Sequence, residues 1–245
     1  MNGTRGTRWR VALAEEGRRH VGAALDWIWP SQCSRCGARV ACAREQFCET
    51  CWGSLRTLAP ADRTWLVQGV RAHAAFAVNG HFLEMLTTSK YRRVRPVGWR
   101  LAREAASRLA FAGAGALVPV PLTRDKRRER GFNQPEDFAH ALSDVGLGPV
   151  RADILTRRRG GRALAGRRRK ERAAAVAGAF RAVAAARSIP LVLVDDVVTT
   201  GSTALACVQA LRSAGWDQVQ VVAMGRAFQA SQDRAHPGSD LWERL

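Results

Sequence analysis

The sequence predicts an α/β protein with a parallel sheet flanked by helices and a small cysteine module before it. The clearest evidence is a strand, a helix and a strand in succession over residues 191–194, 203–214 and 219–224, because parallel strands need a crossover connection that is usually a helix. The apolar run 116–121, which contains two prolines, predicts a further buried strand that ends in a rigid turn. Two cysteine pairs between residues 33 and 51 have the spacing of metal ligands.

The composition indicates an anionic partner. The chain has 245 residues, and 39 Lys and Arg against 21 Asp and Glu give a net charge of +18. Such a surplus favours binding to phosphate groups or nucleic acid and carries no information about the fold. Uncharged runs such as 109–123 are shorter than the roughly 20 apolar residues that a membrane helix needs. Residues 1–30 have no continuous apolar core, so we expect no signal peptide, no membrane span and a cytoplasmic protein.

Four parts are predicted along the chain. Residues 1–30 contain an amphipathic helix over 8–28, whose apolar positions recur at helical spacing. Residues 31–60 form the cysteine module and a Pro-containing linker, and residues 61–228 form the main domain. Residues 229–245 carry no pattern and are expected to fray as a tail.

The main domain is expected to begin with a strand over 70–78, which ends at the turn signal Asn79-Gly80. Apolar residues at helical spacing then predict helices over 81–90 and 97–111. The buried strand 116–121 follows, so the first half of the domain alternates strands with helices.

A second group of elements follows this strand. The charged segment 124–133 predicts a basic loop, and the next helix opens at Asn133 and ends near Gly146. Residues 150–155 are expected to form another strand. The arginine-rich segment 156–172 contains three glycines, so it predicts a mobile basic loop or ribbon, with a merely solvated segment as the alternative.

The strand 191–194 leads directly into two acids and a turn that opens a helix. The turn residues are Thr199, Thr200, Gly201, Ser202 and Thr203. The N–H groups and the dipole at a helix N-terminus favour a phosphate, whereas Asp195 and Asp196 repel it and suit ligand hydroxyls or Mg²⁺. A ligand with a phosphate at one end and a diol at the other satisfies both halves. A simple helix cap would account for one acid but not for two.

The segment 191–203 resembles the motif with which type I phosphoribosyltransferases bind 5-phosphoribosyl 1-pyrophosphate, PRPP. The resemblance implies that Asp195 and Asp196 contact the ribose 2′- and 3′-hydroxyls and that the turn residues cradle the 5′-phosphate. It also implies that Mg²⁺ bridges pyrophosphate and ribose oxygens with few direct protein ligands.

A second basic segment, 118–134, follows the strand 116–121, so its charges can face the same crevice as the aspartates. Its Pro-containing strand, arginine-rich run and closing Arg-Gly-Phe-Asn-Gln resemble the ComF family of competence-associated, phosphoribosyltransferase-like proteins. The resemblance implies that Arg128 and Arg130 neutralise the pyrophosphate and act with the two aspartates in catalysis. It also assigns to the PRPP site Pro119, Val120, Lys126, Asn133 and Gln134.

The ComF resemblance spans residues 25–227 and has departures. Thr123 stands where the family usually has His, Lys126 where Arg is common, and Ala175 where Asn is frequent. These positions fall in the region expected to cover the substrate, so the resemblance predicts PRPP binding and leaves enzymatic activity open. Lys90, at the end of a predicted helix, fits an exposed helix end and a ligand contact equally well.

The cysteine module carries the pattern Cys33-x2-Cys36-x11-Cys48-x2-Cys51. Four thiolates in two chelating pairs suit a closed, structural Zn²⁺ site, and such a short segment has too little core to fold well without metal. Four unliganded thiols are the alternative. Arginines around the module and the rings of Phe47 and Trp52 also permit contact with nucleic acid, although such rings more often form the core of a small module.

Two hypotheses of function follow. The first is a phosphoribosyltransferase-like protein that binds PRPP with Mg²⁺, releases pyrophosphate, and serves DNA uptake or nucleotide metabolism. The second is a non-catalytic competence factor that binds single-stranded DNA, retains the phosphate pocket and acts with a helicase-like partner. The sequence identifies neither the acceptor substrate nor the oligomeric state.

Overall fold

The structure is a computed structural model in which the chain divides into two compact units, Met1–Ser54 and Leu55–Leu245. It describes residues 31–41, 45–91, 94–109, 115–158, 178–185 and 189–228. The predicted helix 8–28 and the tail 229–245 lie outside these described residues, as does most of the arginine-rich segment. Within the described part, no helix combines the length and the hydropathy that crossing a membrane requires.

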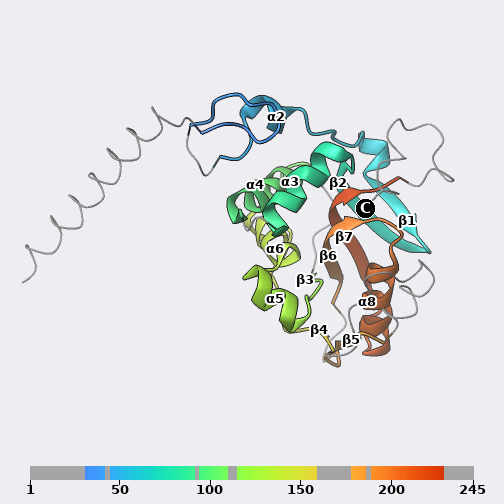
Figure 1. The fold of residues 1–245 in the computed structure, drawn as a ribbon. Helices are drawn as coiled ribbons and strands as arrows, with labels where there is room; N and C mark the ends of the chain where they lie inside the picture. Colours follow the sequence, from blue (N-terminus) through green and yellow to red (C-terminus); the bar gives the residue numbers. More distant parts are fainter. Residues whose placement is uncertain are drawn as a thin grey trace, which may run out of the picture. The chain divides into compact units, whose positions relative to one another are not determined.

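The larger unit contains a five-stranded sheet in the order β1-β2-β7-β6-β3 (Figure 1). Its strands are β1 (Thr64–Val67), β2 (Val70–Ala77), β3 (Ala116–Pro119), β6 (Leu191–Val198) and β7 (Val219–Arg226). The pairs β2–β7, β6–β7 and β3–β6 are parallel, and only β1 runs antiparallel to its neighbour. The predicted fold class, an α/β protein with a mostly parallel sheet flanked by helices, is confirmed.

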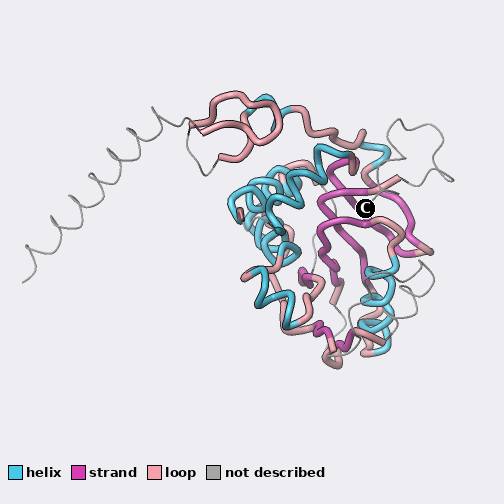
Figure 2. The backbone as a smooth tube through the Cα atoms, viewed as in Figure 1, coloured by secondary structure: helices cyan, strands magenta, loops and turns pink. Residues whose placement is uncertain are grey.

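Helices cover both faces of this sheet (Figure 2). One face packs against α8 (Ser202–Ser213), where Val208 and Leu211 meet Leu191 and Leu193 of β6 in a fully buried cluster. The helices α3 (Gly80–Tyr91), α4 (Arg95–Ala106) and α6 (Gln134–Asp144) lie on the other side, and α6 packs against β3 and β6. Burial on both faces explains why β6 begins with an unbroken apolar run.

The turn predicted at Asn79-Gly80 is the start of α3. The Asn79 side-chain Oδ1 accepts a hydrogen bond from the Phe82 N–H at 2.9 Å and caps the helix. The helix predicted over 97–111 runs from Arg95 to Ala106. Beyond Ala106 the N–H groups of Arg108 and Leu109 bond carbonyls only three residues back, so the pattern continues as tight turns and not as α-helix.

The basic loop predicted over 124–133 is wrong, because Arg124–Arg130 forms the helix α5. The Thr123 hydroxyl accepts a hydrogen bond from the Lys126 N–H at 3.3 Å, and Gly131 ends the helix with φ of +78°. Arg, Lys and Glu are good helix formers, so local propensity is sufficient once both ends are capped. An ion pair between Arg127 and Glu136, at 3.0 Å, joins α5 to α6.

The strand predicted over 150–155 lies further along the chain in the structure. Val150 makes an isolated parallel bridge to Leu117, and the next strand is β4 (Leu155–Arg157). It pairs antiparallel with β5 (Phe180–Ala182) in a two-stranded ribbon apart from the main sheet. Residues 156 and 157 therefore begin a ribbon, one of the two forms expected for the arginine-rich segment.

The edge strand β1 was missed by sequence reasoning. It joins β2 through the two residues Gln68 and Gly69, both with positive φ, at +46° and +83°. This is the backbone of a tight hairpin turn, but Gln in place of Asn or Asp at its first position removes the usual sequence signal.

Candidate functional site

Two neighbouring aspartates stand at the carboxyl end of β6. The strand extends past its apolar run, and Asp195 still pairs with Ala223 of β7 in the sheet register. The charge of Asp195 raises the pKa of Cys207 of α8, whereas Asp196 pairs with Lys90 of α3. The two carboxyls lie at the edge where open parallel sheets bind ligands, and successive side chains of a strand point to opposite faces.

Asp196 is stabilised as a carboxylate. Its Oδ1 accepts a hydrogen bond from the Val197 N–H at 2.7 Å, and its Oδ2 forms an ion pair with the Lys90 ammonium. Burial alone would raise the pKa of Asp196, but the Lys90 charge and the backbone N–H hold that pKa below its usual value. The side chain is still 18% exposed, so a ligand can reach it.

Asp195, in contrast, is stabilised in its protonated form. It is 8% exposed, and its Oδ1 accepts a hydrogen bond from the Asp196 N–H at 2.9 Å. Burial and then the negative charge of Asp196 raise the pKa of Asp195 to about 8. Near neutral pH the two carboxyls therefore hold one proton between them and carry about one negative charge.

The turn after β6 forms a small cavity that includes Asp195. Its volume is about 60 Å³, and its lining consists of Asp195, the end of β6 and residues 199–204. The hydroxyls of Thr200 and Ser202 lie 2.8 Å apart at the start of α8, where backbone N–H groups have no helical partner. The cavity thus brings an acid and an anion-binding helix end into one space.

Gly201 is the residue that this turn requires. It lies just before α8 with φ of +75°, in the left-handed region that favours glycine. A Cβ at this position would also lie 2.3 Å from Cγ1 of Val67, in the edge strand β1. The turn 199–203 is therefore packed tightly against the β1–β2 hairpin.

Basic side chains near Lys90, the partner of Asp196, interact with one another. Lys126 is solvent-exposed, yet partial desolvation and then the charges of Arg130 and Arg157 lower its pKa, with a further contribution from Lys90. The Arg130 guanidinium lies 5.2 Å from the ring of Tyr91. Of the two predicted catalytic arginines, Arg130 thus belongs to this group, and Arg128 lies on the same helix with an exposed side chain.

The remaining predicted ligand residues lie at the end of β3. The Val120 N–H donates to the Val194 carbonyl at 2.8 Å, which places Pro119 and Val120 beside the end of β6. The Asn133 amide donates to the Val120 carbonyl at 3.1 Å. Asn133 and Gln134, the N-cap and first residue of α6, are only 3% and 4% exposed, so the start of α6 is buried against the end of β3 and against α4.

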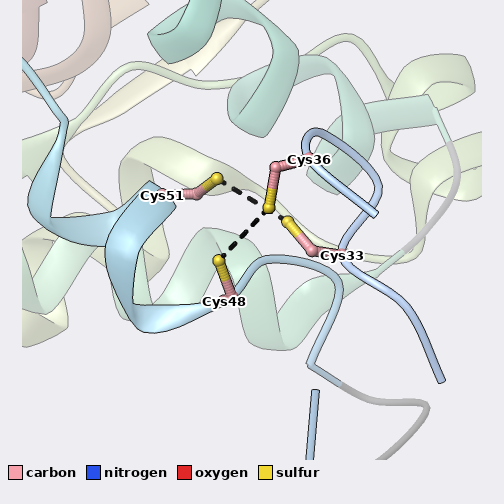
Figure 3. Close-up of side chains that lie close together, drawn as sticks. All are labelled: Cys33, Cys36, Cys48 and Cys51. Atoms are coloured by element: carbon pink, nitrogen blue, oxygen red, sulfur yellow. Dashed lines mark hydrogen bonds between the residues drawn. The ribbon is translucent and has the colours of Figure 1, made fainter. Parts of the chain in front are cut away.

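The four cysteines of the smaller unit form a cluster (Figure 3). Their sulfur atoms all lie within 4.8 Å of one another, with Cys33 to Cys51 at 3.7 Å and Cys36 to Cys48 at 3.6 Å. A tetrahedral site with Zn–S bonds of about 2.3 Å places its sulfurs about 3.8 Å apart. The donor set and its geometry therefore fit a tetrahedral metal ion such as Zn²⁺.

Backbone groups of this cluster also stabilise a thiolate. Burial would raise the pKa of Cys33, but N–H groups of Cys36, Cys48 and Arg35 lower it to about 6. Phe47 and Trp52 are buried and meet edge to face, with ring centroids 6.2 Å apart. The two rings form the core of the module and are not stacking faces for nucleic acid bases.

Comparison with known proteins adds one finding. Over 115 residues the chain is 32% identical to the curated protein named Competence protein F of Haemophilus influenzae. The chain is a homologue of Competence protein F. The match covers 46% of this chain and 50% of the relative, so the chain spans about half the length of the curated protein it matches. No protein-family model matches.

This homology confirms the predicted ComF resemblance. One departure from the ComF pattern also acquires a structural role, because Thr123 caps the N-terminus of α5.

Two residues of the site were not assigned from the sequence. Lys90 was left between an exposed helix end and a ligand contact, and the structure places it on Asp196. Arg157 was counted only as part of the arginine-rich segment, and it lies close enough to Lys126 to lower that residue's pKa. A pairing between distant elements leaves no local sequence signal for either residue.

Proposed function

We propose that this chain binds PRPP together with Mg²⁺ at the carboxyl edge of the sheet. The observation that carries the proposal is the cavity in which Asp195 and the turn 199–204 line one space. The N-terminus of α8 and the hydroxyls of Thr200 and Ser202 suit the 5′-phosphate. Asp195 and Asp196 suit the ribose hydroxyls, because carboxyl oxygens accept hydrogen bonds.

The basic side chains Lys126, Arg130 and Arg157 would bind the pyrophosphate end of this ligand. Lys126 and Arg130 interact electrostatically with each other, and Lys126 also interacts with Lys90, the partner of Asp196, so these cations could neutralise a pyrophosphate. Mg²⁺ would be held mainly by ligand oxygens and would supply further neutralisation of the leaving pyrophosphate. In a transfer reaction the bond from the anomeric carbon to pyrophosphate breaks while an acceptor forms a new bond there, and the aspartates orient the ribose.

For the cysteine cluster we propose a structural Zn²⁺. All four positions of a tetrahedral ion are taken by Cys33, Cys36, Cys48 and Cys51, which leaves none for a substrate.

A role in DNA uptake, in the cytoplasm, is the second part of the proposal. It is supported by the name of the homologue, Competence protein F. Single-stranded DNA, with a helicase-like protein as partner, is the second candidate ligand. One observation favours it: α5 has no buried residue and carries exposed basic side chains.

Calorimetric titration of PRPP with Mg²⁺ into the zinc-loaded full chain tests the first part. We compare the wild type with an Asp195→Asn/Asp196→Asn double variant, and an Asp144→Asn variant at the exposed end of α6 is the matched control. Binding by wild type and control, but not by the double variant, is the expected result. A folded wild type without affinity for PRPP would overturn the proposal.

Titration with single-stranded DNA at several salt concentrations tests the second candidate. If DNA binds, its affinity should fall steeply with salt, since each neutralised phosphate releases counterions. Competition by DNA against bound PRPP would place both ligands on the same surface, and independent binding would separate them.

A further inference from the structure

The ion pair between Lys90 and Asp196 links the end of α3 to the end of β6, inside the candidate site. The two side chains are 15% and 18% exposed, so both are reachable from the site without lying free in solvent. The pair uses Oδ2 of Asp196, while Oδ1 is already bonded to the Val197 N–H. Each oxygen of Asp196 therefore has a protein partner before any ligand arrives.

The backbone that carries Lys90 is fixed. Thr88 and Ser89, the two residues before it, are 5% and 0% exposed. Ser89 fits closely against α4, because a Cβ on Gly98 would lie 2.3 Å from the Ser89 Oγ. The last turn of α3 is thus held in the core, and any movement of the Lys90 charge must come from its flexible four-carbon side chain.

The Lys90 ammonium also lies close to the basic group of the site. Its charge contributes to the lowered pKa of Lys126, together with the charges of Arg130 and Arg157. The Lys90 ammonium therefore pairs with the negative charge of Asp196 and also interacts with cations that repel it. An anion that enters among those cations would compete with Asp196 for Lys90.

We propose that Lys90 is a movable counter-ion that makes the site selective for ligands carrying a diphosphate. In the ligand-free site it pairs with Asp196. When the diphosphate of the ligand enters, Lys90 turns to it, and Oδ2 of Asp196 becomes free to accept a hydrogen bond from the ligand diol. A ligand with the phosphate and the diol alone offers Lys90 no alternative partner, so its diol must compete with Lys90 for Asp196. The inference rests on the proposed function and adds to it a residue that sets specificity.

The test compares two ligands that differ only in the diphosphate. PRPP and ribose 5-phosphate are titrated, each with Mg²⁺, into the wild type and a Lys90→Met variant. We expect the PRPP affinity to fall by about 10- to 100-fold, the size of a lost charge-assisted contact. The affinity for ribose 5-phosphate should stay unchanged or increase, since its diol no longer competes with Lys90.

Two further variants control the comparison. Lys90→Arg keeps the charge and should restore most of the PRPP affinity. Arg212→Met removes an equal charge from the exposed C-terminal turn of α8 and should change neither affinity. Lys90→Gln, with the same two ligands, serves as the second substitution if the Met variant does not fold.

The possible failures are distinguishable. Equal losses for both ligands in the Lys90 variants would show that Lys90 only holds Asp196 in place, and would overturn the inference while leaving PRPP binding intact. A folded wild type that binds neither ligand would overturn the proposed function, and this inference with it.

Discussion

Single residues at the end of β6 divide the acid chemistry of the site unequally. Asp196 has a cation and a backbone N–H beside its oxygens, so its pKa falls. Asp195 is buried next to that negative charge, so its pKa rises to about 8. A neutral carboxyl can donate a hydrogen bond as well as accept one, whereas a carboxylate only accepts. The two neighbouring side chains therefore offer a ligand diol different hydrogen-bonding groups at neutral pH.

Stability should depend on pH through Asp195. Its pKa in the folded protein lies above the unfolded value, so its stabilising contribution is complete below about pH 4 and is lost as pH rises toward 8. In the Asp195→Asn variant the side chain cannot ionise, so this loss of stability at high pH does not occur. We expect the variant to gain at least about 3 °C in Tm over the wild type at pH 8, and much less at pH 5.

Thermal unfolding of both proteins at the two pH values measures this difference. Asp144→Asn, at an exposed position, is the control and should show no such dependence on pH. A gain that is the same at pH 5 and pH 8 would mean that Asp195 is already ionised in the folded protein.

At the scale of elements, two short features set the geometry of the site. The turn 199–201 positions the start of α8 behind the tip of β6, and its Gly201 packs against Val67 of β1. The helix α5 carries Lys126 and Arg130, which interact electrostatically, and it is defined by its two caps, since none of its residues is buried. The helix α5 therefore depends on its local caps, whereas the turn depends also on the buried core through Val67.

Gly201→Ala should destabilise the protein and abolish ligand binding. The new methyl group meets Val67 at a distance that no packing tolerates, and φ of +75° adds backbone strain. We expect a loss of about 1–3 kcal/mol in the free energy of unfolding, measured by denaturant titration. A Gly201→Ala/Val67→Ala double variant should recover the part of the lost free energy of unfolding that is due to the clash with Val67. If nothing is recovered, the whole loss comes from backbone strain at position 201.

Thr123→Ala should loosen α5 without unfolding the domain. The substitution removes the cap on the Lys126 N–H and costs about 1 kcal/mol of helix stability. Because α5 has no buried side chain, the effect should be faster amide exchange over 124–130, with little change in global Tm. Thr123→Ser keeps a hydroxyl and should exchange like the wild type. If the free energy of unfolding of the whole domain falls as much as the stability of α5, then α5 unfolds only together with the domain.

At the scale of the whole molecule, the alternating strands and helices of the sheet were easier to predict from the sequence than α5 and β1. The strands β2, β3, β6 and β7 and the helices between them follow hydrophobic patterns that burial on both faces imposes. The exceptions are governed by local chemistry or by distant contacts. Charge density in 124–130 was interpreted as a loop although caps make it a helix, and the Gln68-Gly69 turn hid β1.

The site shows the same division. The aspartates and the turn 199–203 are adjacent in sequence, so a motif predicted them as a group. The pairing of Lys90 with Asp196 joins residues that only the packing of α3 beside β6 brings together. The amino-acid pattern near Lys90 contains nothing that indicates this contact.

The two compact units also permit a prediction about metal. We expect about one Zn²⁺ per chain, and its removal by a chelator should abolish amide protection over residues 31–41 and 45–54. Metal analysis and amide exchange measure these two effects. Cys48→Ser should reduce bound zinc to near zero. Cys207→Ala, which changes a buried cysteine of α8 outside the cluster, should retain it. Full zinc content in the Cys48 variant would contradict a four-cysteine site.

The contact between Gly201 and Val67 has a consequence for how this sequence can change over generations. The β1–β2 hairpin packs against the turn 199–203, so the volumes of the side chains at positions 67 and 201 are constrained together. A larger residue at 67 would push on the turn, and a smaller one would leave it without support. Selection that preserves this turn would therefore also act on position 67, in a hairpin outside the residues that we propose to bind the ligand.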